Sequence, residues 1–405
     1  MRTHRMGKSC QFALGLLLLV LSEGGCAGNT SSTPEPMRDG GEKTSSDGGG
    51  LVDDSSVPSS RDGSMASQRD SSTAMAEADA STVNPNQPPP GTPTIVGVGN
   101  WGLRGITDDG AAWTYCSNPA AANDHSPDLL RNVAYGNGFF VAVGGDANSM
   151  VMRSSDGLSW EEDLHPTDSC PSETYPATCK NWMGAVTYGD GVWIAGGGNG
   201  AMMRSTDDGK QWKPLSPSPT PPAIRSLTYG EGLFAAGADG GVVLISADQG
   251  ETWTSYDLWD YPFSVAYGGG VFIAWGAQWN GSDFDRACFV GEQAGSTWTP
   301  CDAAVADRTS FVHDGTRWVA AGGGSYATST DGLTWASHIA SNVPSIILFT
   351  GSGFVGRGNG AAWAASAALD DWQMIASNVP DFRAWTVGPV AKGVQAIGMV
   401  CKDLR

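Results

Sequence analysis

The stretch RSTDDGKQW, residues 204–212, combines a serine, two aspartates, a glycine and a closing tryptophan. Close copies are RSSDGLSW (153–160), ISADQGETW (245–253) and TSTDGLTW (328–335). In a tight turn of this composition, the aspartate accepts hydrogen bonds from backbone N–H groups and the glycine permits positive φ. The tryptophan then packs against a neighbouring element. We therefore expect these stretches to hold the fold together and not to carry its chemistry.

A unit of roughly 40 residues surrounds each copy, a length typical of a propeller blade. Residues 131–160, RNVAYGNGFFVAVGGDANSMVMRSSDGLSW, show its pattern. A first strand (133–135) leads through a glycine-rich turn (136–138) into a second strand (139–143). A third strand ends at Ser154, and a fourth follows the turn. Short apolar runs bounded by Gly, Asn and Asp are typical of antiparallel hairpins.

The number of turns predicts the number of blades. Their tryptophans are Trp113, Trp160, Trp212, Trp253, Trp298, Trp335 and Trp372. The well-preserved turns carry Asp156, Asp207, Asp248 and Asp331, to which we assign structural roles. Three turns deviate, with Ile106 in place of Ser, Gln293 in place of Asp, and Ala368 and Leu369 in place of Asp and Gly. The pattern predicts an all-β fold, a seven-bladed β-propeller of four-stranded antiparallel blades.

The recurring turn resembles the Asp-box, or bacterial neuraminidase, repeat of β-propellers, and the resemblance covers residues 94–401. It implies that residues 94–405 form one propeller. In such a ring, the turn between the first and second strands shares a face with the turn between the third and fourth. Ligands usually bind on the other face, around the axis. The turn aspartates would then lie away from the ligand.

Both chain ends are expected to build one blade. The C-terminal piece from Arg383 supplies a first and a second strand, whereas the first repeat supplies a third and a fourth. A shared blade removes the open sheet edges of the ring. Two segments compete for the second strand, TIVGVG (94–99) and VQAIG (394–398), and the sequence leaves this choice open.

The N-terminal quarter reads as an export signal and a tether. Residues 1–26 have basic residues, an apolar run from Phe12 to Leu21 and then small residues, the layout of a signal peptide. Cys26 resembles the lipid-attachment cysteine of bacterial lipoproteins; the alternative is cleavage near Ala27 without lipid. Residues 27–93 are rich in Ser, Asp, Gly and Pro, which predicts a disordered linker. We expect an outer-membrane or cell-surface lipoprotein, or otherwise a secreted or periplasmic protein.

The six cysteines beyond Cys26 are even in number, as in exported proteins with disulfides. Cys301 and Cys116 each lie three residues after a turn tryptophan, so a Cys288–Cys301 pair predicts a matching Cys116–Cys401 pair between the two chain ends. Cys170–Cys179 would close a small loop. The alternative is that the cysteines are free buried thiols.

The charge of the chain restricts its partners. The formal net charge is −19 and there is no basic stripe, which argues against nucleic acid and against direct binding to anionic membranes. A lipid anchor would be the one link to a membrane. Histidine is sparse and no CxxC pair occurs, so we expect no zinc site and no cofactor.

Three arginines occupy one blade position, the first residue of the innermost strand: Arg131, Arg225 and Arg383. Arg308 joins them as a fourth if its turn is one residue longer. Guanidinium groups that converge from several blades suit a carboxylate ligand. Sialidases place arginines comparably, and Phe382-Arg383 matches two residues of their Phe-Arg-Ile-Pro motif, although no Tyr–Glu nucleophile pair is identifiable. The alternative is that these arginines pair with nearby aspartates or repeat by duplication.

Aromatic residues expected in loops of the same face are a second candidate. The long insertion GAQWNGSDFDRA (276–287) carries Trp279, Asp283 and Asp285. Aromatic planes beside carboxylates and amides suit sugar rings; packing between blades is the alternative. With Asn280 the two aspartates offer three oxygens, too few for a typical Ca²⁺ site. The other members of this set are Trp182, Trp259, Tyr261, Trp275 and Tyr326.

The sequence therefore favours a monomeric, surface-displayed or secreted binding module for glycan or protein. The alternative is a glycan-active enzyme, a sialidase-like hydrolase or a lyase on an acidic sugar, that uses the arginine cluster. An assembly or receptor protein is a third class. No catalytic residues can be assigned from the sequence.

Overall fold

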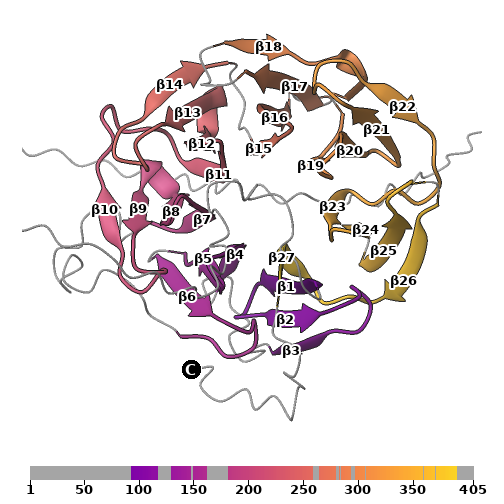
Figure 1. Ribbon diagram of the computed structural model, residues 1–405, viewed down its shortest axis with the longest axis horizontal. Helices are drawn as coiled ribbons and strands as arrows, with labels where there is room; N and C mark the ends of the chain where they lie inside the picture. The colour runs from indigo at the N-terminus through magenta and orange to yellow at the C-terminus, as the bar shows by residue number, and fades with distance from the viewer. Residues whose placement is uncertain are drawn as a thin grey trace, which may run out of the picture. The chain divides into compact units, whose positions relative to one another are not determined.

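Figure 1 shows a computed structural model of the chain. Two compact units are distinguished, Met1–Asp79 and Ala80–Arg405, and all described residues belong to the second. The signal peptide, Cys26 and most of the linker predicted from the sequence lie outside the described residues. The structure describes residues 93–116, 129–146, 149–161, 181–258, 264–279, 282, 284–292, 297–305, 307–358, 360–369 and 371–389.

Seven antiparallel sheets form a ring, which confirms the predicted seven-bladed propeller (Figure 1). The strands of each blade are given with the inner strand first. The first blade, which closes the ring, consists of β27 (Phe382–Pro389), β1 (Pro93–Gly99), β2 (Arg104–Thr107) and β3 (Thr114–Cys116), and the second of β4 (Leu130–Gly136), β5 (Phe139–Gly144) and β6 (Met150–Ser154). The third blade consists of β7 (Met183–Gly189), β8 (Val192–Gly197), β9 (Met202–Ser205) and β10 (Lys213–Leu215), and the fourth of β11 (Ile224–Gly230), β12 (Leu233–Ala238), β13 (Val242–Ser246) and β14 (Thr254–Asp257).

The fifth blade consists of β15 (Ser264–Gly268), β16 (Val271–Trp279), β17 (Phe284–Gly291) and β18 (Trp298–Pro300). The sixth consists of β19 (Ser310–His313), β20 (Trp318–Gly322), β21 (Ser325–Ser329) and β22 (Ala336–His338), and the seventh of β23 (Ile346–Phe349), β24 (Gly353–Gly358), β25 (Ala361–Ser366) and β26 (Gln373–Ser377). The described part of the chain also contains the short 3₁₀ helices η4 (Gly198–Gly200), η5 (Asp239–Gly241) and η6 (Ala303–Val305). In the second blade, the fourth strand is reduced to one bridge between Arg153 and Glu161.

The tight turns between first and second strands explain the glycine pattern. In the β4–β5 turn, Asn137 and Gly138 have φ values of +46° and +84°. Two successive left-handed residues are the geometry of a type I′ hairpin turn, which matches the twist of its strands. Asp190 and Gly191 repeat this conformation between β7 and β8, with φ values of +49° and +76°.

The aspartate turns hold the third and fourth strands as predicted. In the quoted stretch, Asp207 Oδ1 accepts the Gln211 N–H at 2.9 Å and the Ser205 hydroxyl at 2.8 Å. The indole N–H of Trp212 donates to the carbonyl of Gly209 at 2.9 Å. The Trp212 ring is buried with Val141 of the neighbouring β5, so the turn of one blade packs on the preceding blade.

One turn differs from the sequence interpretation. The spacing of the repeat puts Ile106 at the serine position, but in the structure Thr107 takes that role. Its hydroxyl accepts from Gly110 N–H at 3.0 Å and donates to Asp109 Oδ1 at 2.9 Å. Asp109 Oδ1 also accepts from Ala111 N–H at 2.7 Å. Aspartate turns occur in two lengths, and the one from Ser154 to Trp160 is one residue shorter than the one from Ser205 to Trp212. The first turn is therefore a complete aspartate turn of the shorter length and not a degenerate copy.

The ring closes between the chain ends. Strand β27 pairs with β1 from Pro93↔Pro389 to Gly99↔Phe382. TIVGVG is thus the second strand of the closing blade, which resolves the choice that the sequence left open. The competing segment VQAIG lies outside the described residues.

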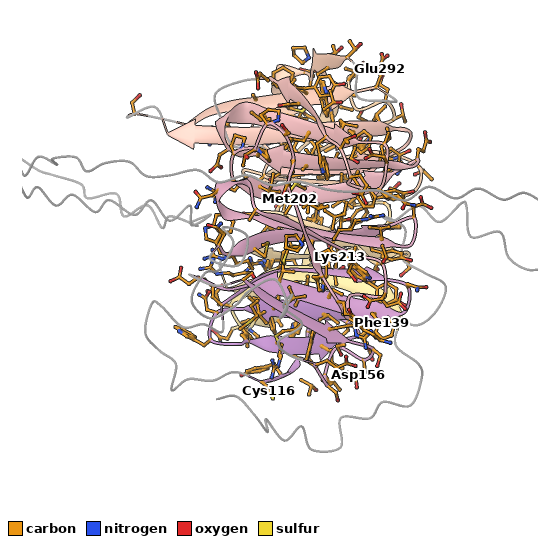
Figure 2. The ribbon with its side chains drawn as sticks, turned by 90° about the vertical axis from the view of Figure 1, so that its left-hand side faces the viewer. Cys116, Phe139, Asp156, Met202, Lys213 and Glu292 are labelled. Atoms are coloured by element: carbon orange, nitrogen blue, oxygen red, sulfur yellow. A yellow bond between two sulfur atoms is a disulfide. The ribbon has the colours of Figure 1, made fainter. Side chains whose placement is uncertain are left out.

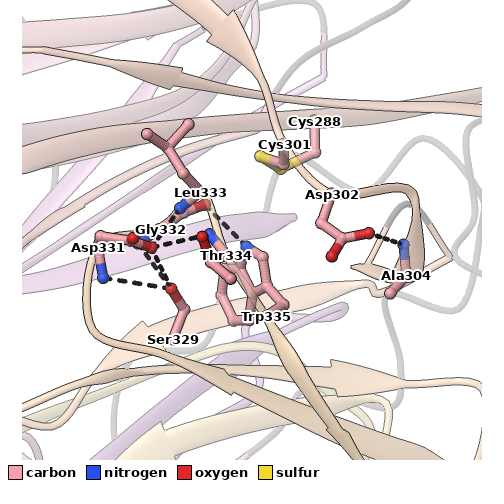
Figure 3. Close-up of a disulfide and its surroundings, with 10 residues drawn as sticks. All are labelled: Cys288, Cys301, Asp302, Ala304, Ser329, Asp331, Gly332, Leu333, Thr334 and Trp335. Carbon is pink, nitrogen blue, oxygen red and sulfur yellow. Dashed lines mark hydrogen bonds between the residues drawn. A yellow bond between two sulfur atoms is a disulfide. The ribbon is translucent and has the colours of Figure 1, made fainter.

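The predicted Cys288–Cys301 disulfide is present, and Figure 3 shows it beside the aspartate turn of the sixth blade. It links the third strand of the fifth blade to the residue after β18, and both cysteines pack around buried Trp335. Cys116 is also disulfide-bonded. Since Cys401, Cys170 and Cys179 lie outside the described residues, the other two pairings stay predictions. Within the described part of the chain, no helix has the length and apolar character needed to cross a membrane.

Candidate functional site

The inner strands of four neighbouring blades begin with a β-bulge. The pairing of β4 shifts between Leu130 and Asn132, which leaves Arg131 as the bulged residue. Arg225 is the bulged residue of β11 in the same way, and Arg383 that of β27. A bulge leaves one residue out of the ladder and redirects its side chain. The three arginines that the sequence aligned therefore share one structural position.

This position lies at the end of the ring opposite the aspartate turns. Strand β4 starts at its bulge and runs to its tight turn, so Arg131 and Gly136 mark opposite ends of the strand. Figure 2 shows the ring from the side, with Phe139 and Asp156 toward one edge and Cys116 toward the other. The arginines thus occupy the face on which the sequence placed the ligand.

In the third blade an indole replaces the arginine. Gly184 is the bulged residue of β7, and a β-carbon there would lie 2.5 Å from the Trp182 ring. Only glycine leaves room for this indole. The guanidinium carbons of Arg131 and Arg225, from the blades on either side, each lie 5.0 Å from the centroid of the Trp182 ring. Trp182 therefore joins the two arginines by cation–π contacts.

A further arginine, Arg357 on β24, joins the cluster. It donates to the backbone carbonyl of Arg383 at 3.1 Å and lies 3.6 Å from Asp381 Oδ1. Burial and the charge of Arg383 lower the pKa of Arg357, and Asp381 opposes them. Sequence alignment missed Arg357 because it sits on a second strand and not on an inner one. We call Arg131, Trp182, Arg225, Arg357 and Arg383 the arginine site.

The charges of the site are poorly compensated at Arg131. Burial, and then repulsion from Arg383 and Arg225, lower the pKa of Arg131 to about 10, against the attraction of Asp146. Arginine remains protonated at neutral pH under these conditions. Arg383 and Arg225 thus both lie within electrostatic reach of the Arg131 guanidinium. A bound anion would relieve this repulsion.

The arginines differ in how many donors they leave available. Both oxygens of Asp239 accept from Arg225, at Nε and Nη2, each at 2.5 Å. Arg131 uses Nε for the Gly145 carbonyl at 3.1 Å, and its Nη2 lies 4.0 Å from Asp146. Arg383 uses Nε for Asn100 Oδ1 at 2.5 Å. Among the described residues, neither terminal nitrogen of Arg383 has a hydrogen-bond partner.

The two interpretations of the arginines therefore apply to different residues. A two-point hydrogen-bonded pair with a neighbouring aspartate describes Arg225, whereas Arg131 and Arg383 make no hydrogen bond to an aspartate among the described residues. Arg308 does not join the site: its side chain is buried and its Nη1 donates to Asp307 Oδ1 at 2.7 Å and to the Gly322 carbonyl at 3.3 Å. Of the four arginines expected from the sequence, three come together.

Several aromatic residues expected in loops lie in strands instead. Trp275 is part of β16, and its indole N–H donates to the Thr309 carbonyl at 3.3 Å while its ring lies 4.8 Å from that of Phe311. Tyr326 is buried in β21 and stacks on His338 at 4.7 Å. Both make packing contacts within and between blades, which is the alternative to sugar binding for these residues.

The predicted insertion 276–287 is mostly a pair of long strands. Trp279 ends β16, and Asp285 lies in β17. Trp259, Tyr261, Asn280 and Asp283 lie outside the described residues, so the sugar-binding and Ca²⁺ hypotheses for this region stay untested. In the described ranges, no group of three or more His, Cys, Asp or Glu side chains is arranged to hold a metal ion.

The fold and the candidate site together define a seven-bladed β-propeller with several arginines on one face. No protein-family model matches the sequence, and no curated protein matches it. Among solved structures, a YCF48 protein bound to D1 peptide has a TM-score of 0.45 and 18% identity, over 60% of this chain and 81% of that chain. A computationally designed protein, Ika8, has a TM-score of 0.43 and 10% identity, over 67% and 80%. YCF48 from Cyanidioschyzon merolae has a TM-score of 0.42 and 16% identity, over 68% and 94%.

Proposed function

We propose that this protein is an exported binding module that holds an acidic glycan at the arginine site. The observation that carries the proposal is the pair Arg131 and Arg383. These two cations come from adjacent blades and repel each other, and among the described residues their terminal nitrogens make no hydrogen bond, although Arg131 Nη2 lies 4.0 Å from Asp146. A planar guanidinium with two free donors suits the paired hydrogen bonds of a carboxylate or sulfate.

The surroundings of the two arginines favour a sugar over an acidic peptide. Asp146 and Asp381 border the site, with 40% and 89% of their side chains exposed. Carboxylates accept hydrogen bonds from hydroxyl groups, which sugars supply in number. They would repel further negative charges along an acidic peptide. A sugar with one anionic group among many hydroxyls therefore suits a site in which arginines lie beside exposed carboxylates.

Binding is a better match than hydrolysis. A glycosidase needs two carboxyl groups flanking the scissile bond, one of them free to transfer a proton. Asp239 has both oxygens engaged by Arg225, and Asp381 lies beside Arg357. These contacts give the carboxylates a role in positioning arginines. The proposal therefore keeps the arginine cluster as the site for an acidic sugar, as in the sialidase-like alternative, but does not include hydrolysis of that sugar.

The test is a glycan array probed with the mature secreted chain, followed by calorimetry on the best acidic oligosaccharide and its neutral counterpart. Arg131→Gln and Arg383→Gln should each weaken affinity about ten- to a hundredfold, the loss of a charge-assisted hydrogen bond. Binding should also weaken as salt is raised, because a partly open ion pair is screened.

The matched control is Arg204→Gln, which removes the same charge at the aspartate-turn edge. Arg204 pairs with Glu251 and donates to Gln249 Oε1 at 3.0 Å, away from the arginine site. Its affinity should equal that of the wild type. A neutral oligosaccharide bound equally well by the wild type and by the Arg131→Gln/Arg383→Gln double variant would refute the proposal.

A further inference from the structure

Trp101 lies in a tight turn at the arginine face. Strand β1 ends at Gly99, and the Leu103 N–H donates to the Asn100 carbonyl at 3.0 Å, which closes a four-residue turn. Trp101 and Gly102 are its central residues, with φ values of +56° and +62°. Two left-handed central residues define a type I′ turn, which favours Asn, Asp or Gly at both positions.

Tryptophan is a poor choice for this position on conformational grounds. A bulky L-residue with positive φ is strained, and such residues collect at functional sites. At the equivalent position of turns on the opposite face, Asn137 and Asp190 follow the rule, with φ values of +46° and +49°, whereas Glu231, at +48°, is an exception. The left-handed conformation of Trp101 therefore does not explain why a tryptophan occupies this position.

Burial does not compensate for this strain. Leu369 also has positive φ, at +62°, but its side chain is fully buried in the core of the sixth and seventh blades. Trp101 is 46% exposed, which places it among the few exposed large apolar side chains of the described residues. An exposed indole held at a strained position points to a role outside the fold.

Its neighbour ties the turn to the arginine site. Asn100, the preceding residue, accepts from Arg383 Nε at 2.5 Å, so the turn and one of the two available arginines are fixed to each other. We propose that Trp101 is a ligand-contacting residue, whose indole provides the surface on which the sugar ring of the acidic glycan stacks. This inference rests on the proposed function and adds a specificity-determining residue to it.

The chemistry of stacking fits the rest of the site. A pyranose ring presents C–H groups on its faces and hydroxyls around its rim, and aromatic side chains bind such faces. The anion would engage Arg131 and Arg383 while the ring face contacts Trp101. An acidic ligand without a ring face would gain from the arginines alone.

Trp101→Asn is the decisive variant, because asparagine suits the left-handed turn. It should raise the thermal midpoint of unfolding and weaken binding of the best acidic oligosaccharide from the array about three- to tenfold, the loss of an aromatic contact. Trp101→Tyr should restore most of the affinity. Tyr115→Ala, which removes an equally exposed aromatic from β3 of the same blade, is the control and should leave binding unchanged.

The outcomes separate this inference from the proposed function. If Arg383→Gln weakens binding but Trp101→Asn does not, the stacking role is wrong and the arginine site stands. If Trp101→Asn lowers the thermal midpoint, Trp101 serves the fold, and the inference is overturned. If the wild type binds no acidic oligosaccharide, both proposals fail. A wild type that dimerises in a Trp101-dependent manner would assign the indole to self-association instead.

Discussion

His313 is the residue whose protonation most directly tests the packing of the inner strands. It stands where other inner strands carry tyrosine, and its β-carbon lies against Gly268 of the fifth blade. The ring is buried, accepts the Gly315 N–H at Nδ1 at 3.1 Å and meets Trp318 edge-on at 5.3 Å. Burial lowers the pKa of His313, and the charge of Asp314 partly opposes it.

This pKa shift gives a signed pH dependence. The unfolded chain binds a proton on His313 near the ordinary value of about 6.5, whereas the folded protein binds it at lower pH. The contribution of neutral His313 to the free energy of unfolding is therefore complete above the unfolded pKa of about 6.5 and is lost as pH falls through the folded pKa. Urea unfolding at pH 7.5 and 5.5 should show a larger loss for the wild type than for His313→Tyr. Equal losses in the two proteins would contradict the shift.

At the residue scale, the sequence predicted the blade position of the arginines better than it predicted their hydrogen-bond and ring-contact partners. Alignment placed Arg131, Arg225 and Arg383 at one position, because a repeat fixes the strand on which a residue lies. It did not predict that Asp239 engages Nε and Nη2 of Arg225, since this depends on side-chain distances. The sandwich around Trp182 was also missed, because it requires the exception at Gly184 in the intervening blade.

At the scale of elements, tyrosine–glycine contacts join one inner strand to the next. A β-carbon at Gly230 of β11 would lie 2.1 Å from the ring of Tyr267 on β15. The same contact joins Gly189 to Tyr229, and Gly388 of the closing blade to Tyr135. The absence of a side chain at these glycines is thus what lets neighbouring inner strands approach.

Gly230→Ala should therefore lower the free energy of unfolding by about 1 to 3 kcal/mol, the cost of overpacking a closely packed contact. The control is a double-mutant cycle with Tyr267→Ala, which removes the ring that the new methyl group meets. The two substitutions should be less than additive in urea unfolding. Additive effects would show that Gly230 is required for a reason other than the Tyr267 ring.

Element boundaries were the part of the fold that spacing alone did not determine. Aspartate turns occur in two lengths, and counting back from Trp113 with the longer form places Ile106 at the serine position. The hydrogen bonds of Thr107 show that the shorter form applies. The polar insertion 276–287 was likewise predicted as a loop, but cross-strand pairing from Gly276↔Ala287 to Trp279↔Phe284 makes it an extended hairpin.

At the scale of the whole molecule, the number of blades and their closure followed from the sequence because each blade repeats one turn. What remained ambiguous was the strand at the junction, where both TIVGVG and VQAIG are candidates for the second strand. The pairing of β1 with β27 decides it. Both termini of the ring thus contribute to one sheet, and its stability depends on keeping them together.

A disulfide between the chain ends would serve that purpose, and we expect Cys116 to pair with Cys401. Cys116 ends β3, the outer strand of the closing blade, and is disulfide-bonded. In the fifth blade the observed Cys288–Cys301 bond closes a segment of only 13 residues. A bond that encloses nearly the whole ring restricts the unfolded chain more, so Cys401→Ser should lower the free energy of unfolding by about 2 to 5 kcal/mol.

Two measurements check this pairing. Peptide mapping without reduction should recover the Cys116 and Cys401 peptides joined, and the Cys401→Ser protein should unfold at lower urea concentration than a Cys288→Ser/Cys301→Ser variant. The comparison matters because both variants lose one disulfide, and only one of them frees the chain ends. If the two variants are equally destabilised, the disulfide between the chain ends stabilises the propeller no more than the Cys288–Cys301 bond does. Recovery of Cys116 joined to Cys170 or Cys179 would refute the pairing itself.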